Sequence, residues 1–495
     1  MLFNSWAYLV FLIVGISLYY LLPSRLRVGF ICLASLVFYS MWKWQFTFLL
    51  IFSAFIDFCC ARRISMSTRA AHRLAFLILT LSINIGLLIF FKYTYFLLDN
   101  VSVLAGVLGY NDLDFRNIGF SIILPLGISF YTFQTISYTI DVYRGVISAE
   151  KSFPTFLTYV VFWPHLIAGP ILRSVELMPQ IKTIHSFRWD NILKGTEILV
   201  IGLFKKIVLA DNFAKLVDFW FEKDAGALTA FDVWVACFAF GLQIYFDFSG
   251  YSDIAIGSAR MLGIQLTENF DWPYMALSPK DFWKRWHITL SSWIRDYLYL
   301  PLTGQRFQTT SAGGIAIDDT KSASEGRRAA ALLGTWFIMG LWHGAAWTFA
   351  LWGVYHGLLV LVYRVCKPLK RLPQWNPAVA WVLMLFLSMA GWIFFRAQSL
   401  SQALTMFATI LNPMKYKTSL LVTGMSSRLA GYSYMWVPLV IAGMVCLYIF
   451  RLKISSQYEM ALSYSVGKSI AMAVMICLML IYMGTGQNQF IYFQF

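Results

Sequence analysis

The sequence predicts an all-α protein that crosses a membrane many times, and three observations lead to that class. Of the 495 residues, 59% are hydrophobic and only 13% are charged, about half the charged fraction of a water-soluble domain. Apolar runs long enough to cross a bilayer as helices recur along the whole chain. The net charge of +15 fits basic loops that face anionic lipid. We expect roughly eleven to thirteen spans or part-spans.

The expected membrane helices follow one another without a soluble domain between them. The first lacks the basic start and the small-residue cleavage site of a signal peptide, so we expect it to be retained as a span. No linker, fixed-period repeat or second domain is visible, which predicts one membrane-embedded domain over residues 1–495. The expected runs are Trp6–Leu22, Gly29–Trp42, Phe46–Cys60, Leu74–Phe91, Ile118–Tyr138, Phe153–Ile167, Ile192–Ala210, Phe231–Phe248, Ala330–Ala350, Leu351–Val365, Val379–Phe395, Tyr434–Phe450 and Lys468–Met483.

Two polar stretches between these runs carry information about topology and domain content. The loop Ala61–Arg73 holds four arginines and no acidic residue. Short loops rich in Arg and Lys stay on the cytoplasmic side, so we expect this loop inside and the N-terminus outside. The longest polar stretch, Thr303–Arg328, is rich in Gly, Ser and Thr. It predicts a flexible loop that is too short to form a folded domain.

A histidine lies deep in an apolar run, in the stretch MGLWHGAAW from Met339 to Trp347. On a helix, i, i+3, i+4, i+7 spacing places four residues on one face: Gly340, His343, Gly344 and Trp347. The two glycines remove bulk beside the imidazole, so this face is expected to line a path for a slender substrate. Helix packing through small residues, with His343 hydrogen-bonded to a neighbour, is the open alternative. Ionisable residues inside a membrane are costly, which favours a functional role.

A second histidine occurs in the stretch SPKDFWKRWHITLSSWIRDYLYLPL, Ser278–Leu302. Its Ser-Pro-x-Asp start predicts a helix with a capping serine and a proline in the first turn. Three tryptophans mixed with Lys and Arg favour a helix at the membrane interface. A surface helix with no further role is the alternative, but His287 falls at the rim, where the helix can face inward.

Other polar residues in apolar runs have simpler explanations. Asp247 and Asp253 are expected to hydrogen-bond within the bundle or to pair with Arg260. Pro164 and Pro170 bracket His165 and predict a broken or re-entrant segment, in which His165 is structural. His356 follows His343 by about 220° around an ideal helix, so the two histidines do not share a face unless the helix breaks.

Several motifs occur together and in one order: AGPILR, YFDFSGYSDIAIG, DFWKRWHITLSSWIRDYLYLPL, MGLWHGAAWTFALWGVYHG and the terminal FIYFQF. They resemble the membrane-bound O-acyltransferase superfamily and, within it, the bacterial alginate O-acetyltransferase subunit I group. The resemblance implies a ring of tilted helices around a thin core with a central tunnel. It also implies that His343, in the WHG motif, is catalytic, and it assigns His287 to the second histidine motif.

The resemblance implies acyl transfer from a thioester to a hydroxyl, which needs a base and a group that polarises the carbonyl. His343 is the expected base, because burial disfavours imidazolium and keeps the ring neutral. His287 is expected to polarise the carbonyl or to orient the donor. No nucleophile elbow is visible, so direct transfer is preferred. Acetyl-coenzyme A is the expected donor, with phosphate contacts from Lys280, Lys284 and Arg285. Neither a resident cofactor nor a metal is expected, and the cysteines lack metal spacing.

The predicted function is therefore O-acetylation of a secreted polysaccharide, such as alginate or cellulose, from a cytoplasmic donor across the bacterial inner membrane. An extracytoplasmic acetyltransferase is expected as a partner, together with the polymer and membrane lipid, and no nucleic acid. Two alternatives remain. One is D-alanyl transfer to teichoic acid on the same fold, and the other is a polysaccharide or lipid transporter, against which the lack of an inverted repeat argues.

Overall fold

A computed structural model gives the structure of the protein. It describes residues 1, 3–110, 121–167, 169–183, 185–309, 315–318, 323–366, 376–417, 439, 466–482 and 490–491. The chain divides into two compact units, each assembled from separate stretches. Unit 1 comprises residues 1–192, 258–267 and 305–321, and unit 2 comprises residues 193–257, 268–304 and 322–495. The single domain expected from the sequence stays a prediction.

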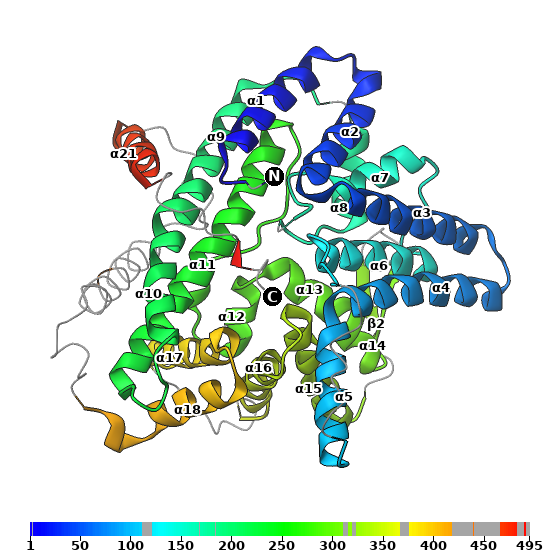
Figure 1. Cartoon of the computed structure of the whole chain (residues 1–495). Coiled ribbons are helices and arrows are strands. Elements are labelled where there is room, and N and C mark those ends of the chain that lie inside the picture. The colour runs from blue at the N-terminus through cyan, green and yellow to red at the C-terminus, as the bar shows by residue number, and fades with distance from the viewer. Residues whose placement is uncertain are drawn as a thin grey trace. The chain divides into compact units, whose positions relative to one another are not determined.

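Unit 1 is built mainly from antiparallel helices near the N-terminus. Helices α3, α4 and α6 pack against one another, and α2 packs on α7 (Figure 1). A short antiparallel hairpin also belongs to this unit. The elements are α1 (Trp6–Leu21), α2 (Ser24–Lys43), α3 (Gln45–Met66), α4 (Ala70–Leu88), the π-helix η1 (Ile89–Tyr93), α5 (Thr94–Val107), α6 (Ile128–Arg144), α7 (Phe153–Val161), α8 (Ser174–Lys182), β1 (Arg306–Thr309) and β2 (Ile315–Asp318).

Unit 2 contains the long helix α11 and the helices α15 and α16, which carry His343 and His356; α9 and α11 each have one end in unit 1. The elements are α9 (Trp189–Phe204), the π-helix η2 (Lys205–Ala210), α10 (Asp211–Phe221), α11 (Ala230–Met261), η3 (Pro273–Met275), α12 (Pro279–Arg285), α13 (Ile288–Ile294), the π-helix η4 (Arg295–Tyr299), α14 (Leu300–Leu302), α15 (Glu325–His343), α16 (Trp347–Cys366), α17 (Pro377–Arg396), α18 (Leu400–Leu411), η5 (Pro413–Lys415) and α21 (Val466–Tyr482).

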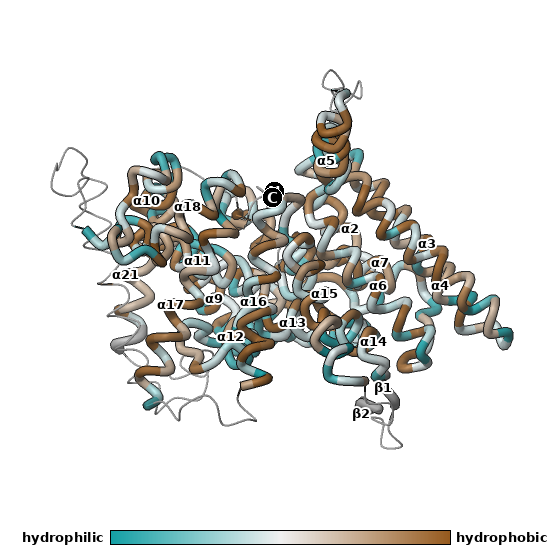
Figure 2. Tube along the Cα trace, turned by 90° about the horizontal axis from the view of Figure 1, so that it is seen from below, coloured by the Kyte–Doolittle hydropathy of each residue, from teal (hydrophilic) through white to brown (hydrophobic). Residues whose placement is uncertain are grey.

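The expectation of a polytopic membrane protein is confirmed. Within the described residues, five helices are long and apolar enough to cross a membrane: Ser24–Lys43, Ala70–Val107, Ala230–Met261, Trp347–Cys366 and Pro377–Arg396. Three shorter apolar helices accompany them. Large apolar side chains such as Ile13 and Phe48 are exposed, as expected where helices face lipid, and Figure 2 shows long hydrophobic stretches along the helices. Apart from residue 439, the expected span Tyr434–Phe450 lies outside the described residues.

Two expected loops differ from the structure. Helix α3 continues to Met66 and α4 begins at Ala70, so Arg62 and Arg63 belong to the end of a helix, and only three residues separate the two helices. The stretch expected to be a flexible loop contains the hairpin of β1 and β2 and the start of α15. In both places, backbone hydrogen bonding extends regular structure into polar sequence.

Glycines allow α15 and α16 to pack closely as a helical hairpin. A Cβ at Gly340 would lie 2.2 Å from the carbonyl oxygen of Phe349, and one at Gly353 would lie 2.1 Å from that of Trp336. Small residues permit such close approach between membrane helices. The hairpin fixes the end of α15, and His343 is the last residue of that helix.

Candidate active site

His343 occupies the C-terminal end of α15 and is only 2% exposed. Its ring packs edge-on against Trp342 and Trp352, with ring centroids 4.9 Å away in each case. The ring of Phe395, on α17, lies 5.4 Å away. A helix C-terminus carries partial negative charge and favours a cation. A protonated His343 would be stabilised by this helix end, in surroundings that otherwise exclude charge.

The expectation that four residues around His343 share one helical face is wrong. Helix α15 ends at His343, Gly344 has extended backbone, and Trp347 begins α16 with its side chain 49% exposed. Neighbouring protein atoms occupy the space beside the two glycines: a Cβ at Gly344 would lie 2.1 Å from the ring of Phe349, and Gly340 faces Gly353. These glycines bring two helices together, and the tunnel-lining role of Gly340, Gly344 and Trp347 stays a prediction.

His287 lies at a break in the predicted interfacial helix. Ser278 caps α12 as expected, accepting a hydrogen bond from the amide of Asp281, but α12 ends at Arg285 and α13 begins only at Ile288. His287 has φ 41° and ψ 56°, a left-handed conformation that is uncommon without glycine. Backbone strain of this kind is often found at functional sites.

Burial and hydrogen bonds to an antiparallel segment of backbone hold His287 in this conformation. The ring is fully buried, and the tryptophans on either side of the break are buried too, so this segment is not a surface helix at the membrane interface. The amide of Ile288 donates to the carbonyl of Asn269 (2.9 Å), and the amide of Asp271 donates to that of Arg285 (2.9 Å). Burial lowers the pKa of His287 to about 3, so the ring is neutral at physiological pH.

The hydrogen bonds of Asn269 determine which nitrogen of His287 carries the proton. The side-chain oxygen of Asn269 accepts from the amide of Thr289 (3.3 Å), which can only donate, and it lies 3.0 Å from His287 Nδ1. Nδ1 must therefore be the donor. A neutral imidazole has one N–H and one lone pair, so Nε2 carries the lone pair and accepts rather than donates.

The structure brings three histidines together within unit 2; we call His287, His343 and His356 the histidine cluster. The indole of Trp342 touches two of them, with ring centroids 6.4 Å from His287 and 4.9 Å from His343. His356 belongs to the cluster because the helix breaks between α15 and α16. A helix break was the condition under which His343 and His356 were expected to share a face. The ring of His356 lies 5.0 Å from Trp352, which also touches His343. The angle of about 220° between His343 and His356 on an ideal helix did not predict that they lie near each other.

The three basic residues expected to hold coenzyme A phosphates differ in exposure and in their ion pairs. Lys280 and Lys284 are exposed on α12. Arg285 is half-buried and lies 2.8 Å from Asp281 and 3.3 Å from Asp271, measured between side-chain nitrogen and oxygen atoms. Arg285 is therefore engaged in fixing the segment around His287, whereas the two lysines are available to an anionic ligand.

A second polar group in unit 2 involves two lysines that the sequence reasoning missed. We call Lys205, Lys206, Asp211, Asp247 and Asp253 the ion cluster. Lys206 Nζ lies 2.6 Å from Asp247 and 2.9 Å from Asp211, and Lys205 Nζ lies 2.7 Å from Asp253. The pairing of these aspartates with Arg260 is wrong, because Arg260 lies 4.0 Å from Asp190 instead. Two adjacent lysines inside an apolar run were the available signal.

His165 matches its expected environment. Helix α7 stops at Val161, and the backbone around the two prolines is irregular, as the broken segment predicted. His165 is 4% exposed and lies 5.8 Å from the ring of Phe162 in unit 1. It is not a member of the histidine cluster, and the structural role expected for it stays a prediction.

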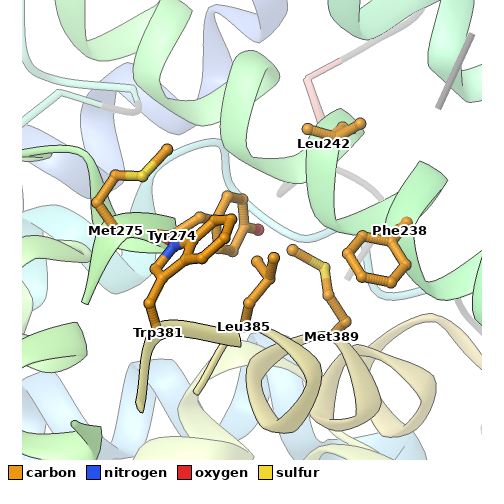
Figure 3. Close-up of a pocket in the computed structure, with 7 residues that line it drawn as sticks. All are labelled: Phe238, Leu242, Tyr274, Met275, Trp381, Leu385 and Met389. Atoms are coloured by element: carbon orange, nitrogen blue, oxygen red, sulfur yellow. The ribbon is translucent and has the colours of Figure 1, made fainter. Parts of the chain in front are cut away.

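An apolar pocket lies between α11, η3 and α17 (Figure 3), with Phe238, Tyr274 and Met389 among its lining residues. Its polar groups are already bonded: the hydroxyl of Tyr274 donates to the carbonyl of Gly241, and the indole of Trp381 donates to that of Tyr274. The ring of Tyr274 also packs 6.0 Å from Trp286, next to His287. The pocket offers hydrocarbon contact and does not suit the phosphates of a coenzyme.

Comparison with known proteins shows to which family of proteins this chain belongs. Residues 145–316 match the membrane-bound O-acyltransferase family. The probable alginate O-acetylase of Azotobacter vinelandii is 36% identical over 416 residues, covering 83% of this chain and 78% of that protein. The peptidoglycan O-acetyltransferase of Helicobacter pylori is 36% identical over 438 residues, covering 82% and 78%. The teichoic acid D-alanyltransferase of Bacillus subtilis is 27% identical over 269 residues, covering 52% and 64%.

A polytopic helical membrane protein with buried histidines and these similarities is an acyltransferase by class. The chain belongs to the membrane-bound O-acyltransferase family. It is an O-acyltransferase, which excludes the transporter considered from the sequence. The resemblance seen in the motifs is confirmed.

Proposed function

We propose that this enzyme moves acetyl groups from a cytoplasmic thioester across the membrane for the O-acetylation of an extracytoplasmic glycan, with His343 as the general base. The observation that carries this proposal is that two buried histidines, His343 and His287, both pack near the ring of Trp342, with ring centroids 4.9 and 6.4 Å away. Relatives named for acetyl transfer align over 82–83% of the chain, compared with 52% for the D-alanyl relative. This difference supports acetyl as the transferred group.

The proposed reaction is a direct transfer. His343 takes the proton from the acceptor hydroxyl, the hydroxyl oxygen attacks the thioester carbonyl carbon, and the carbon–sulfur bond breaks. The leaving thiolate takes this proton from the His343 imidazolium, so the coenzyme departs as a thiol and the base is regenerated. Imidazolium formed on His343 is stabilised by the C-terminus of α15. General-base catalysis of this kind typically contributes about 10²–10⁴-fold.

The tautomer of His287 narrows its role. With Nδ1–H donated to Asn269, the ring presents a lone pair at Nε2 and cannot donate to a carbonyl from that side. Becoming imidazolium is opposed by burial, which lowers the pKa to about 3. Orientation of a hydroxyl or amide donor group of a substrate therefore fits His287 better than polarisation of the thioester carbonyl.

Donor binding, location and partners follow from the same proposal. Acetyl-coenzyme A is the donor, and the exposed Lys280 and Lys284 contact its phosphates. The enzyme resides in the bacterial inner membrane, so that donor and glycan lie on opposite sides. A long polymer needs an extended groove with many hydroxyl contacts, which short loops do not build. A separate extracytoplasmic acetyltransferase is therefore the partner that places acetyl groups on the polymer.

Reconstitution tests the proposal. The purified protein is placed in liposomes with labelled acetyl-coenzyme A on the cytoplasmic side and alginate on the other, with and without the extracytoplasmic partner. Transfer of label outward by wild type, and its loss with His343→Ala, is the expected result. Outward transfer that persists in the variant refutes the base assignment.

The same vesicles test the acyl group. D-alanyl thioester on a carrier protein is supplied in place of acetyl-coenzyme A. Transfer of D-alanine in preference to acetate would identify the alternative reaction, to which the 27% identical relatives point. Label that reaches the polymer without added partner would show that no relay protein is needed.

A further inference from the structure

His356 sits in an aromatic box between the segments that carry the other two histidines. It lies one turn after Trp352 on α16 and is 1% exposed. The ring of Phe282 stacks on it at 6.1 Å and 7°, and Trp283 meets it edge-on at 5.1 Å. Trp352 and Trp336 complete the box, with ring centroids 5.0 and 6.2 Å away.

The box is an unusual place for an imidazole. Within the described part of the chain, neither ring nitrogen of His356 has a hydrogen-bond partner. Neutral imidazole has one donor and one acceptor nitrogen, and burying both without partners is unfavourable. Phenylalanine would fill the same space without that penalty. The indole N–H groups of Trp283 and Trp352, next to His356, also have no acceptor among the described residues.

The box connects both candidate catalytic histidines. Phe282 and Trp283 belong to α12, and that helix leads directly into His287. On the other side, Trp352 touches His343 at 4.9 Å. A displacement of the His356 ring therefore reaches one histidine through α12 and the other through an indole.

We propose that His356 is a positioning residue for acyl transfer, which sets the relative placement of His343 and His287 through Trp352 and α12. The inference rests on the proposed function of those two histidines. His356 itself does not take part in the proton transfer. Its imidazole nitrogens, rather than its ring shape alone, are what the site uses.

A glycine on a different helix offers an independent way to move the ring. Gly391 lies on α17, and a Cβ added there would be 2.7 Å from His356 Nε2. Gly391→Ala therefore pushes the imidazole, and less strongly the ring of Tyr355, which would lie 3.0 Å from the added Cβ, while it leaves the chemistry of His356 intact. Gly334→Ala is the matched control, because nothing lies within 4 Å of a Cβ at that position on α15.

The test compares His356→Phe, His356→Gln, Gly391→Ala and Gly334→Ala in purified enzyme, with kcat and KM for acetyl-coenzyme A and thermal unfolding measured for each. Misplacement of about 1 Å can cost 10²-fold in rate. We expect kcat to fall about 10- to 100-fold in His356→Phe and in Gly391→Ala, with KM within about twofold of wild type. Gly334→Ala should match wild type.

The relative kcat values of His356→Phe and His356→Gln show whether His356 positions the site or only fills space. If the residue only fills the box, phenylalanine should outperform glutamine; if the nitrogens matter, glutamine should recover part of the lost kcat. Gly391→Ala supplies the kinetic result should His356→Phe fail to fold. Wild-type kcat in both His356→Phe and Gly391→Ala, or a phenylalanine variant better than glutamine, overturns the inference.

His343→Ala is measured in the same series. If that variant remains active, the proposed function fails and this inference fails with it. An inactive His343→Ala beside fully active His356→Phe and Gly391→Ala refutes only the role of His356.

Discussion

The ion cluster and the histidine cluster both place polar side chains in the interior of unit 2, but they differ in charge and pairing. In the ion cluster, each lysine lies within 2.9 Å of a carboxylate oxygen. In the histidine cluster, the neighbours are almost entirely aromatic rings, and His356 has no hydrogen-bond partner in the described part of the chain. The charges of the ion cluster are paired with one another, while the histidine cluster is surrounded mainly by aromatic rings.

The ion cluster and the histidine cluster therefore call for different tests: a structural role is expected for the first, and the proposed function gives the second a chemical role. Buried charges must be paired, and removing one partner leaves an uncompensated charge. The π-helix η2 presents Lys205 and Lys206 to α11, where Asp247 and Asp253 lie. Asp247 also accepts a hydrogen bond from the amide of Ile491 (2.7 Å), so the cluster fixes part of the C-terminal segment. Changes in the ion cluster should therefore affect stability, and changes in the histidine cluster should affect rate.

The largest effect is expected at His343. His343→Ala should lower acetyl transfer by about 10²–10⁴-fold, because the general base is lost while the hairpin of α15 and α16 is retained. The measurement is the rate of labelled acetate transfer at matched amounts of folded enzyme. His72→Ala, an exposed histidine on α4, is the control. A rate within tenfold of wild type would show that His343 is not the general base.

A substitution of Lys206 tests whether the ion cluster stabilises the fold. Lys206→Met leaves Asp247 and Asp211 without their shared cation, and breaking a buried pair costs about 3–5 kcal/mol of the free energy of unfolding. We expect a clear drop in the thermal midpoint in detergent, with the rate per folded molecule much less affected. Lys215→Ala, an exposed lysine on α10, should leave the midpoint unchanged. An equally stable Lys206→Met would mean that the ion cluster is not structural.

Acid should destabilise the enzyme partly through His287. Burial lowers the pKa of this ring from 6.5 to about 3, so below pH 6.5 the unfolded chain binds a proton that the folded protein does not. Stability is therefore full above pH 6.5 and falls as the pH decreases toward 3. His287→Asn, which tolerates the left-handed backbone, should flatten this part of the profile.

The measurement for His287 is the thermal midpoint between pH 7.5 and 4.5 for wild type and variant. His72→Asn serves as the control for a histidine that is exposed. The same acid slope in His287→Asn and in wild type would show that this ring does not stay neutral because of burial.

The smallest effect is expected at the exposed lysines of α12. The double variant Lys280→Ala, Lys284→Ala removes two solvent-exposed charges, each worth only about 0.2–1 kcal/mol to an anionic partner. We expect a few-fold rise in KM for acetyl-coenzyme A and an unchanged kcat. Added salt should raise the KM of the wild type and should change the KM of the variant less. A KM that does not change would place the coenzyme phosphates elsewhere.

The sequence by itself determined the class of fold and pointed to two of the three clustered histidines. Hydrocarbon runs of bilayer length allow little besides helices, because backbone groups in lipid must be satisfied within the segment. Histidines such as His343 and His287 are visible in a sequence for the same reason, since a polar ring in apolar surroundings is costly and needs an explanation. The serine cap at Ser278 was likewise readable, because a helix start is encoded within four residues.

Tertiary structure alone decided where these residues meet. Local spacing placed Trp347 beside His343 and His356 away from it, and the break between α15 and α16 reversed both expectations. The lysine partners of Asp247 and Asp253 come from a π-helix about forty residues earlier in the chain, a distance over which helical periodicity carries no information. The tautomer of His287 also depends on Asn269, a residue from another segment. Contacts between distant segments are set by packing of whole helices, and no local pattern records them.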